Sequence, residues 1–286
     1  MTPAPTERAP AAAEGPGETN YLVPGLDRGL RILTEFSARE PILGAPELSR
    51  RLGIPRTTVF RLLQTLESLG FLERANGERN YRLGVAILRL GFEYLSSLEL
   101  TDLGLPLIEA LRDSTGLSTH IVIRDGRDVV FVAKAQSHAP AFSAVKVNVG
   151  TRLPAHATTH GQVLMGDLTL DELRALYAGV TLQRFTQHTP GTVEELFERV
   201  RADAEQGYAT SESSFEHGIS VVSAPVFGDA GRIVAVVTAT VPRAHFDTAL
   251  PASGLIEQVR ATAHQLSLRL NYRPPAEQRF MNALEI

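Results

Sequence analysis

Residues 45–71 read APELSRRLGIPRTTVFRLLQTLESLGF, and this stretch predicts two short helices joined by a tight turn. Pro46 suits the first turn of a helix, where the N–H group that proline lacks would have no partner within the helix. Gly53 is typical of the position just after a helix ends, because glycine adopts a positive φ without strain. Pro55 favours an extended conformation at Ile54 and suits the start of the next helix. The stretch therefore predicts a helix-turn-helix unit.

The second of these helices, predicted to run from Arg56 to Leu69, has two unlike faces. Apolar residues recur at helical spacing on one face; they are Val59, Leu62, Leu63, Leu66 and Leu69. The polar face has no acidic residue before Glu67 and consists of Arg56, Thr57, Thr58, Arg61, Gln64, Thr65 and Ser68. Arginine donates to phosphate or guanine, glutamine can bridge adenine, and short hydroxyl groups reach phosphate oxygens. The polar face therefore predicts contact with duplex DNA, although any amphipathic helix pair of an all-α domain would share the pattern.

The distribution of charge favours the same interpretation. The whole chain of 286 residues has a formal net charge of −4, which by itself argues against non-specific binding to nucleic acid. Residues 22–83, however, contain ten Arg and seven acidic residues, whereas residues 84–286 contain 17 basic and 22 acidic ones. A segment with a net charge of +3 is thus joined to a larger one with a net charge of −5. This pattern is typical of a DNA-reading domain joined to a domain that does not bind DNA.

The segments on either side complete the predicted DNA-binding domain. Residues 26–37 predict a first helix whose buried face consists of Leu26, Leu30, Leu33 and Phe36. Arg28 lies off that face, where it can contact phosphate or remain in solvent. Asn76-Gly77 predicts a β-hairpin over residues 71–83, because both residues tolerate positive φ. The hairpin carries Arg74, Arg79, Asn80 and Arg82. Three helices followed by this hairpin predict a winged helix-turn-helix over residues 22–83, with Arg79, Asn80 and Arg82 as wing contacts to DNA.

A strongly apolar helix is predicted next, over residues 85–98, within a linker of residues 84–100. Its main apolar face consists of Val85, Leu88, Phe92 and Leu95. A helix with this much apolar surface is expected to be covered, either by a second copy of the chain or by its own chain. We expect it to connect the two domains and to contribute to dimerisation.

Residues 101–272 mix strands and helices and predict an α+β domain with a mostly antiparallel sheet. Helices are predicted over about 104–115, after the capping boxes Thr169/Glu172 and Thr192/Glu195, and over about 251–270. The predicted strands are residues 118–124, 129–135, 142–149, 208–211, 219–227 and 232–241. Residues 1–21 are expected to be a disordered tail and residues 273–286 a loose one.

The composition gives no support to several other classes of function. The chain has no Cys, which excludes disulfides and cysteine nucleophiles and fits a cytoplasmic protein. No apolar run is long enough to span a membrane. Common hydrolase and phosphate-binding motifs are absent, so neither an enzyme nor a cofactor is expected. His156 and His160 are spaced like a metal-binding pair, but Pro154 indicates a loop there, and no metal site is expected. The alternative function is a small-molecule sensor or hydrolase that does not bind DNA.

Three stretches of the chain resemble the isocitrate-lyase-regulator (IclR) family of bacterial transcription factors. They are LGIPRTTVFRLLQTL at residues 52–66, GTRLPAHAT at residues 150–158, and Gly207-Tyr208 through Gly218 followed by VSAPV at residues 222–226. The resemblance implies an N-terminal winged helix-turn-helix, a linker helix and a C-terminal GAF-like effector-binding domain. It also implies a homodimer or homotetramer that binds double-stranded operator DNA of a catabolic operon and responds to a small-molecule effector.

The resemblance further implies where the effector lies. The implied contacts are Phe142, His156, Thr158, Thr159, His160, Ser211, Val221 and Ser223. Many relatives have Asp at the position of Ser211 and a small residue at the position of His160. Hydroxyl and imidazole groups in place of carboxylates should accept an anion more easily. We therefore expect an organic or aromatic carboxylic acid in contact with His160, and a contribution from His156.

Overall fold

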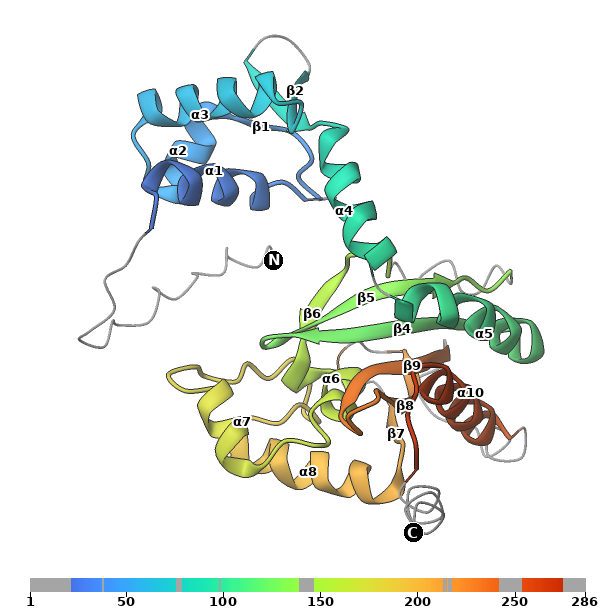
Figure 1. Cartoon of the computed structure of the whole chain (residues 1–286). Helices are drawn as coiled ribbons and strands as arrows, with labels where there is room; N and C mark the ends of the chain where they lie inside the picture. Colours follow the sequence, from blue (N-terminus) through green and yellow to red (C-terminus); the bar gives the residue numbers. More distant parts are fainter. Residues whose placement is uncertain are drawn as a thin grey trace, which may run out of the picture. The chain divides into compact units, whose positions relative to one another are not determined.

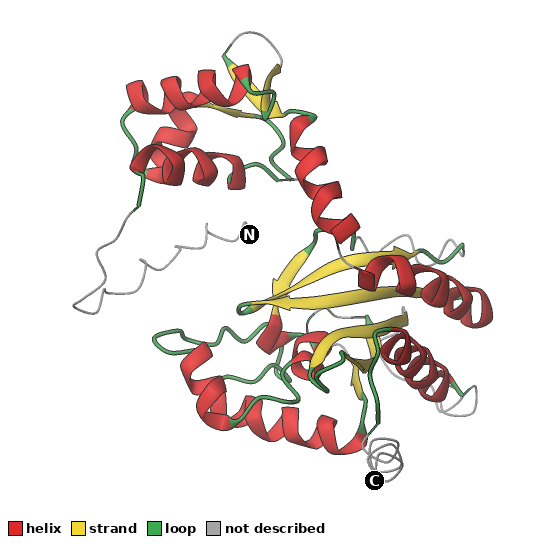
Figure 2. Cartoon of the chain, viewed as in Figure 1, coloured by secondary structure: helices red, strands yellow, loops and turns green. Residues whose placement is uncertain are grey.

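The computed structural model describes residues 22–274, except for residues 38, 76–78, 98, 139–146, 213–214, 216–217 and 242–253. The side chains of Phe92, of residues 95–97 and of Glu212 also lie outside this description. The chain divides into two compact units, Met1–Ser97 and Leu98–Ile286 (Figures 1 and 2).

The N-terminal unit contains the predicted helix-turn-helix. Helices α1 (Pro24–Thr34), α2 (Ala45–Leu52) and α3 (Arg56–Ser68) lie beside a small antiparallel sheet with the strand order β1-β3-β2 (Figure 1). Gly53 follows α2 with a φ of 65°, which confirms the reason for a glycine at this position. Ile54 is buried in the turn, and Pro55 is the N-cap residue of α3.

The predicted hairpin is formed by strands β2 (Leu72–Ala75) and β3 (Asn80–Leu83). They pair antiparallel, with Leu72 opposite Leu83 and Ala75 opposite Asn80. The Asn76-Gly77 turn itself lies outside the described residues. A third strand, β1 (Leu43–Gly44), pairs with β3. It has only two residues, which is too short for a periodic pattern to reveal.

The core of this unit joins the three helices to the hairpin, and its most buried side chains are Ile32, Leu48, Val59, Leu63, Leu72 and Tyr81. The predicted buried face of the first helix is partly wrong. Leu26 and Leu30 are 63% and 55% exposed, whereas Ile32 and Phe36 are buried. The helix carries apolar residues on two faces, and it packs through the face that carries Gly29 and Ile32, with Gly29 next to Leu62 of α3. Leu69, expected in the apolar stripe of α3, is exposed because the helix ends at Ser68.

Helix α4 (Ala86–Ser97) follows the hairpin where the linker helix is predicted. Its start is attached to the hairpin, because the Gly84 amide donates to the Phe71 carbonyl at 2.8 Å. The exposed apolar side chains described on this segment are Val85, Leu88, Leu90 and Tyr94. Those of Phe92 and Leu95, which were expected on the same face, lie outside the described residues.

The C-terminal unit is built on a six-stranded antiparallel sheet with the order β6-β5-β4-β9-β8-β7. Its strands are β4 (Ser118–Asp125), β5 (Asp128–Ala135), β6 (Arg152–Pro154), β7 (Ala209–Glu212), β8 (Ser220–Phe227) and β9 (Ile233–Val241). The central strands β4 and β9 are buried along most of their length, because helices cover both faces of the sheet.

Helices α5 (Glu99–Thr115) and α10 (Leu255–Arg269) pack side by side on one face of this sheet (Figure 1). On the other face, a 3₁₀ turn at Ala155–Ala157 leads into the short helix α6 (Thr159–Leu164). Helix α8 (Val193–Gln206) packs against α6, and α7 (Leu170–Leu176) packs against α8. This architecture confirms the predicted α+β fold class. No helix in the described part of the chain is long and apolar enough to cross a membrane.

Some predicted elements of this unit differ from those observed. Most of the strand predicted at residues 142–149 lies outside the described residues, and residues 147–149 are not in a strand; β6 is found instead. The capping box at Thr169 is complete, but that at Thr192 is not. The Glu195 carboxylate accepts a hydrogen bond from the Gly191 amide at 2.8 Å, one residue before the cap, and it pairs with an arginine.

Candidate DNA interface and effector pocket

The polar face of α3 is directed to solvent. Arg56, Thr57, Arg61 and Gln64 are exposed, and Thr58 is half-buried. The first turn of α3 carries no acidic residue, so the partial positive charge at the start of the helix is not compensated by a side chain of that turn. Neither Arg56 nor Arg61 forms an ion pair with any residue that the structure describes. This face can therefore donate hydrogen bonds to a phosphate or to a base edge.

The acidic residues of the N-terminal unit are paired with other arginines. Six of the seven acidic residues in 22–83 form ion pairs, and the seventh, Glu78, lies outside the described residues. Their partners are Arg31, Arg50, Arg51, Arg74 and Arg82. The arginines without an ion pair among the described residues are Arg28, Arg39, Arg56, Arg61 and Arg79. The positive charge left uncompensated is therefore concentrated on five side chains, two of which belong to α3.

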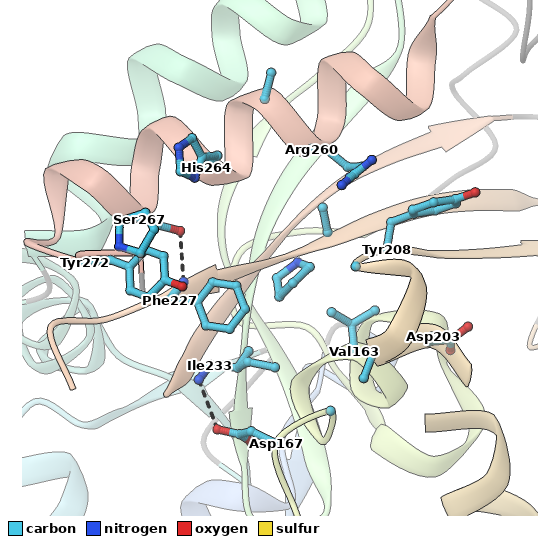
Figure 3. Close-up of a pocket in the computed structure, with 17 residues that line it drawn as sticks. Val163, Asp167, Asp203, Tyr208, Phe227, Ile233, Arg260, His264, Ser267 and Tyr272 are labelled. Carbon is cyan, nitrogen blue, oxygen red and sulfur yellow. Dashed lines mark hydrogen bonds between the residues drawn. The ribbon is translucent and has the colours of Figure 1, made fainter. Parts of the chain in front are cut away.

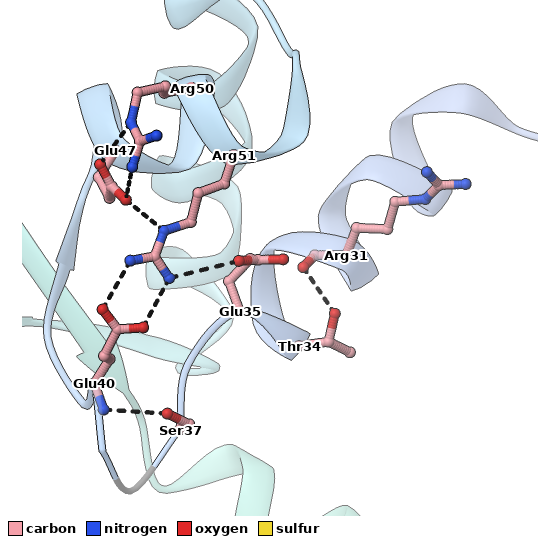
Figure 4. Close-up of polar contacts among 8 residues, drawn as sticks. All are labelled: Arg31, Thr34, Glu35, Ser37, Glu40, Glu47, Arg50 and Arg51. Carbon is pink, nitrogen blue, oxygen red and sulfur yellow. Dashed lines mark hydrogen bonds and ion pairs between the residues drawn. The ribbon is translucent and has the colours of Figure 1, made fainter. Parts of the chain in front are cut away.

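Arg51 shows that part of the basic charge is structural (Figure 4). Its Nη1 and Nη2 atoms donate to the two carboxylate oxygens of Glu40 at 3.0 and 2.8 Å, and its Nε atom donates to Glu47 at 2.5 Å. The hydrogen bonds from Arg51 lower the pKa of the Glu40 carboxyl, because they favour its charged form. Glu35, just after α1, lies 3.7 Å from Arg51. Arg51 thus joins α2 to α1 and to the segment before β1, and it is not available to DNA.

The other predicted DNA contacts, in the wing and at Arg28, differ in their exposure and ion pairing. Arg82 pairs with Glu73 on the facing strand at 2.5 Å, whereas Arg79 is exposed and has no ion pair within the described part of the chain. Asn80 is half-buried next to β1. Arg28 lines a hollow of about 190 Å³ together with residues 53–55, the turn before the recognition helix. Arg28 is therefore placed where a phosphate beside this turn could be contacted.

Five of the implied effector residues line one pocket on the α6 side of the large sheet: Thr158, Thr159, His160, Ser211 and Val221. They come from the start of α6, from β7 and from the start of β8. The remaining described walls are Phe131, Val147, Leu153, Phe215, Ile219 and Thr240. Phe142, which was expected to contribute, lies outside the described residues. The pocket combines hydroxyl groups, one imidazole and an apolar wall.

His160 is held at the base of this pocket. Its Nδ1 atom lies 3.3 Å from Ser223 Oγ, and Ser223 donates to Thr238 Oγ1 at 3.2 Å. Ser223 is therefore not among the described lining residues of the pocket but contacts His160, which is. Burial lowers the pKa of His160 to about 4, because the charged imidazolium would lose its hydration. The imidazole is therefore neutral at pH 7. A neutral imidazole at this position can favour an anion by hydrogen bonding, not by charge.

His156 is placed elsewhere. It is not among the described residues that line the pocket. Its Nε2 atom lies 2.9 Å from the Gln183 carbonyl oxygen, and its ring packs against Tyr177 and Phe185. The expected contact with the effector is therefore not supported, because the 3₁₀ turn directs this side chain toward the segment after α7. In the described part of the chain no three His, Cys, Asp or Glu side chains are grouped to hold a metal.

The sequence did not reveal that Phe131 lines the pocket or that His120 packs behind it. The Phe131 ring stands edge-on between His120 and His160, with ring centroids 5.4 and 5.3 Å away. His120 is 1% exposed, and its Nδ1 atom has no hydrogen-bond partner among the described residues. Burial lowers its pKa to about 3. Strand alternation places His120 and Val122 on one face, but the sequence does not reveal which face of the sheet carries the pocket.

Both units match known protein families. Residues 25–75 match the IclR helix-turn-helix domain, and residues 92–268 match the C-terminal domain of the bacterial transcriptional regulator IclR. The chain is 30% identical over 251 residues to the HTH-type transcriptional regulator XynR of Escherichia coli K12, covering 88% of this chain and 98% of XynR.

Solved structures agree with this fold. A protein from Rhodococcus sp. RHA1 superimposes with a TM-score of 0.74 and 32% identity, covering 87% of this chain and 98% of the other. An IclR homologue from Microbacterium hydrocarbonoxydans, complexed with 4-hydroxybenzoate, superimposes with a TM-score of 0.73 and 22% identity over 86% of this chain and 98% of that one. An exposed basic recognition helix, a pocket above an antiparallel sheet and these matches lead to one conclusion: this chain belongs to the IclR family of transcriptional regulators.

Proposed function

We propose that the protein binds double-stranded operator DNA through α3 and the hairpin, and that a small carboxylic acid bound beside His160 controls this binding. The proposed DNA contacts are Arg28, Arg56, Thr57, Thr58, Arg61, Gln64, Arg79, Asn80 and Arg82. The observation that carries the proposal is the pairing pattern of the N-terminal unit. Its described acidic residues are all engaged by other arginines, whereas Arg56 and Arg61 are exposed and have no ion pair among the described residues. We assign residues 22–83 to DNA binding, 84–100 to the linker and 101–272 to effector binding.

The DNA contact is tested by titrating the protein on duplex fragments from upstream of its own gene and of the neighbouring genes. A shuffled duplex of the same composition is the control. Fluorescence anisotropy at one fixed ionic strength should show a preferred fragment, because specific complexes are typically tighter than non-specific ones by about 10³-fold or more. Equal affinity for every fragment, with and without candidate acids, would contradict the proposal.

The chemistry of the pocket supports an acidic effector. None of the described lining residues is Asp or Glu, so a carboxylate would meet no like charge from these side chains. Thr159, Ser211 and Thr240 supply hydroxyl groups that can donate to an anion, and Phe131 and Phe215 supply an apolar wall for a ring. The Microbacterium hydrocarbonoxydans homologue has the same fold and was crystallised with an aromatic acid, which supports this class of ligand. We propose a binding role, and no catalytic one, for these side chains.

Aromatic carboxylic acids are expected to bind more tightly than their amides, with little change in affinity between pH 6 and pH 8. The carboxylate gains charge-assisted hydrogen bonds that the amide lacks. The flat pH profile follows because the pKa of His160 is lowered to about 4, so its protonation state does not change across this range.

Isothermal titration calorimetry of benzoate and 4-hydroxybenzoate against the matching amides, repeated at both pH values, measures both expectations. Equal affinity for acid and amide would refute the acidic effector. Tighter binding at pH 6 than at pH 8 would show that the acid binds to an imidazolium instead.

We also propose that the protein forms a homodimer or homotetramer, with α1 and α4 contributing to the contacts between copies. The N-terminal unit exposes apolar side chains on both helices and just before them: Leu22, Val23, Leu26, Leu30, Val85, Leu88, Leu90 and Tyr94. Helices that each expose several apolar side chains are typical of protein–protein interfaces.

Replacing Leu26 and Leu88 together with Asp is expected to shift the protein toward the monomer. Both side chains are more than half exposed, so the fold of one chain should tolerate the change. Burying the new carboxylates between two copies would instead cost the dimer roughly several kcal/mol of association free energy. Sedimentation equilibrium measures the mass. Leu268→Asp, on α10 in the other unit and 44% exposed, is the control. A double variant with the mass of the wild type would exclude α1 and α4 from the interface.

A further inference from the structure

A second and larger hollow lies between α10, which packs on one face of the large sheet, and the ends of α6 and α8, which lie on the other face (Figure 3). It has a volume of about 640 Å³ and lies between α10, the end of α8 and the strands β8 and β9. We call it the α10 groove. Its volume is within the range of about 300–1,000 Å³ that is usual for small-molecule sites.

The floor of the α10 groove is apolar. Its apolar lining includes Val163 at the end of α6, Pro225 on β8 and Ile233 on β9. At one end the rings of Phe227 and Tyr272 stack with centroids 4.9 Å apart. A floor of this kind can hold an aliphatic or aromatic group of a ligand by excluding water from it.

Arg260 on α10 supplies a positive charge above this floor. Its guanidinium lies over the Tyr208 ring, 5.7 Å from the centroid, and beside Gly207, the residue that ends α8. No described residue forms an ion pair with it. The aromatic face and the helix C-terminus hold the guanidinium in place while leaving its N–H groups free to donate to an anion.

Asp203, in the last turn of α8, supplies a negative charge on the same side of the groove. It is half-buried, and burial raises its pKa to about 6, although Arg199 lowers it in part. None of the described residues donates a hydrogen bond to this carboxylate. The other acid of the groove, Asp167, is different: it pairs with Arg232 at 2.9 Å and accepts a hydrogen bond from the Ile233 amide at 3.0 Å.

The groove thus holds one cationic and one anionic side chain that have no partner in the described protein, above an apolar floor. We propose that the α10 groove binds a small zwitterion with an apolar body, such as an apolar α-amino acid. The ligand carboxylate binds Arg260, its ammonium group binds Asp203, and its side chain lies on Val163 and Ile233. This site is separate from the effector pocket: α6 contributes His160 to that pocket and Val163 to the groove.

Three probes that share a benzene ring test the proposal on the full-length protein: L-phenylalanine, 3-phenylpropanoate and 2-phenylethylamine. In calorimetric titrations L-phenylalanine should bind most tightly, because only it carries both charges. Arg260→Gln should weaken its binding by about tenfold or more, the typical effect of losing a charged hydrogen bond. Asp203→Asn should reduce L-phenylalanine to the affinity of 3-phenylpropanoate.

Two control variants locate the site. Arg201→Gln removes the same charge from α8 at an exposed position outside the groove and should leave L-phenylalanine binding unchanged. Ser211→Phe fills the effector pocket and should also leave it unchanged, so failure of this proposal is distinguishable from failure of the proposed effector. Absence of L-phenylalanine binding, equal binding of all three probes, or unaltered binding by Arg260→Gln would each overturn the proposal.

Discussion

Replacing both Arg56 and Arg61 with alanine is expected to remove the preference of the protein for its operator over random duplex DNA. Both side chains are exposed on α3, and neither stabilises the fold through an ion pair with a described residue. Each base-reading contact contributes about 1–3 kcal/mol, so the double variant should bind the operator about 30-fold to 10⁴-fold more weakly. Alanine favours the helix, so the N-terminal unit should remain folded.

A matched double variant removes two arginines that the structure shows to be paired. Arg31 pairs with Asp27 at 2.9 Å, and Arg50 pairs with Glu47 at 2.6 Å. Arg31→Ala with Arg50→Ala lowers the net charge by the same amount but leaves α3 intact, and it should preserve the preference for the operator. Anisotropy titrations on operator and shuffled duplex compare the two variants. If the Arg56 and Arg61 variant discriminates as well as the wild type, α3 is not the reading helix.

The second large effect concerns Gly161, in the first turn of α6. A methyl group at this position would overlap the backbone of Ala155, including its carbonyl oxygen. That backbone cannot move freely, since the Ala155 amide donates to the Arg127 carbonyl at 2.9 Å and the Gly161 amide donates to Thr158 Oγ1 at 3.3 Å. Gly161→Ala should therefore cost about 1–3 kcal/mol or more, and lower the melting temperature of the C-terminal unit by about 2–12 °C.

Gly191→Ala is the matched control in the same unit. There the atoms nearest to the added methyl group would belong to the guanidinium of Arg184, an exposed side-chain end that can shift at the cost of its hydrogen bonds to Glu195 and Thr189, whereas the Ala155 backbone cannot. Thermal unfolding followed by circular dichroism should show a much smaller change for this variant. Because α6 also positions Thr159 and His160, Gly161→Ala should weaken effector binding as well. A Gly161→Ala protein as stable as the wild type would show that the turn before α6 is not rigid.

The elements that the sequence predicts well are those whose signals are local. Gly53 and Pro55 mark the turn between α2 and α3, and Thr169 with Glu172 forms the predicted cap. The elements that it predicts poorly depend on the rest of the fold. Leu26 and Ile32 are equally apolar, and only the position of α3 decides which is buried. The Glu195 carboxylate accepts from the Gly191 amide instead of the Thr192 amide, and it also pairs with Arg184, which the fold brings to it from 11 residues earlier in the chain.

The candidate site follows the same rule. The loop before α6 and the start of β8 were identified from a resemblance, and the structure brings Thr158, His160 and Val221 together. The neutral state of His160 could not be predicted, because its pKa depends on burial by residues far away in the sequence. The acid–base pairing of the N-terminal unit was also hidden: a count gives a charge of +3 but not which arginines provide it.

That pairing sets an upper limit on how strongly salt can weaken the complex with DNA. Each phosphate neutralised by a protein cation releases about 0.9 of a condensed counterion from the duplex. Five arginines of the described N-terminal unit are not already neutralised by an acid, whereas Arg82, a proposed wing contact, would have to give up Glu73 to neutralise a phosphate. One head can therefore displace about four to five ions, and two heads on a palindrome about nine. The operator affinity of a dimer should accordingly fall less steeply with rising salt than that of a protein whose ten arginines per head all touched phosphate.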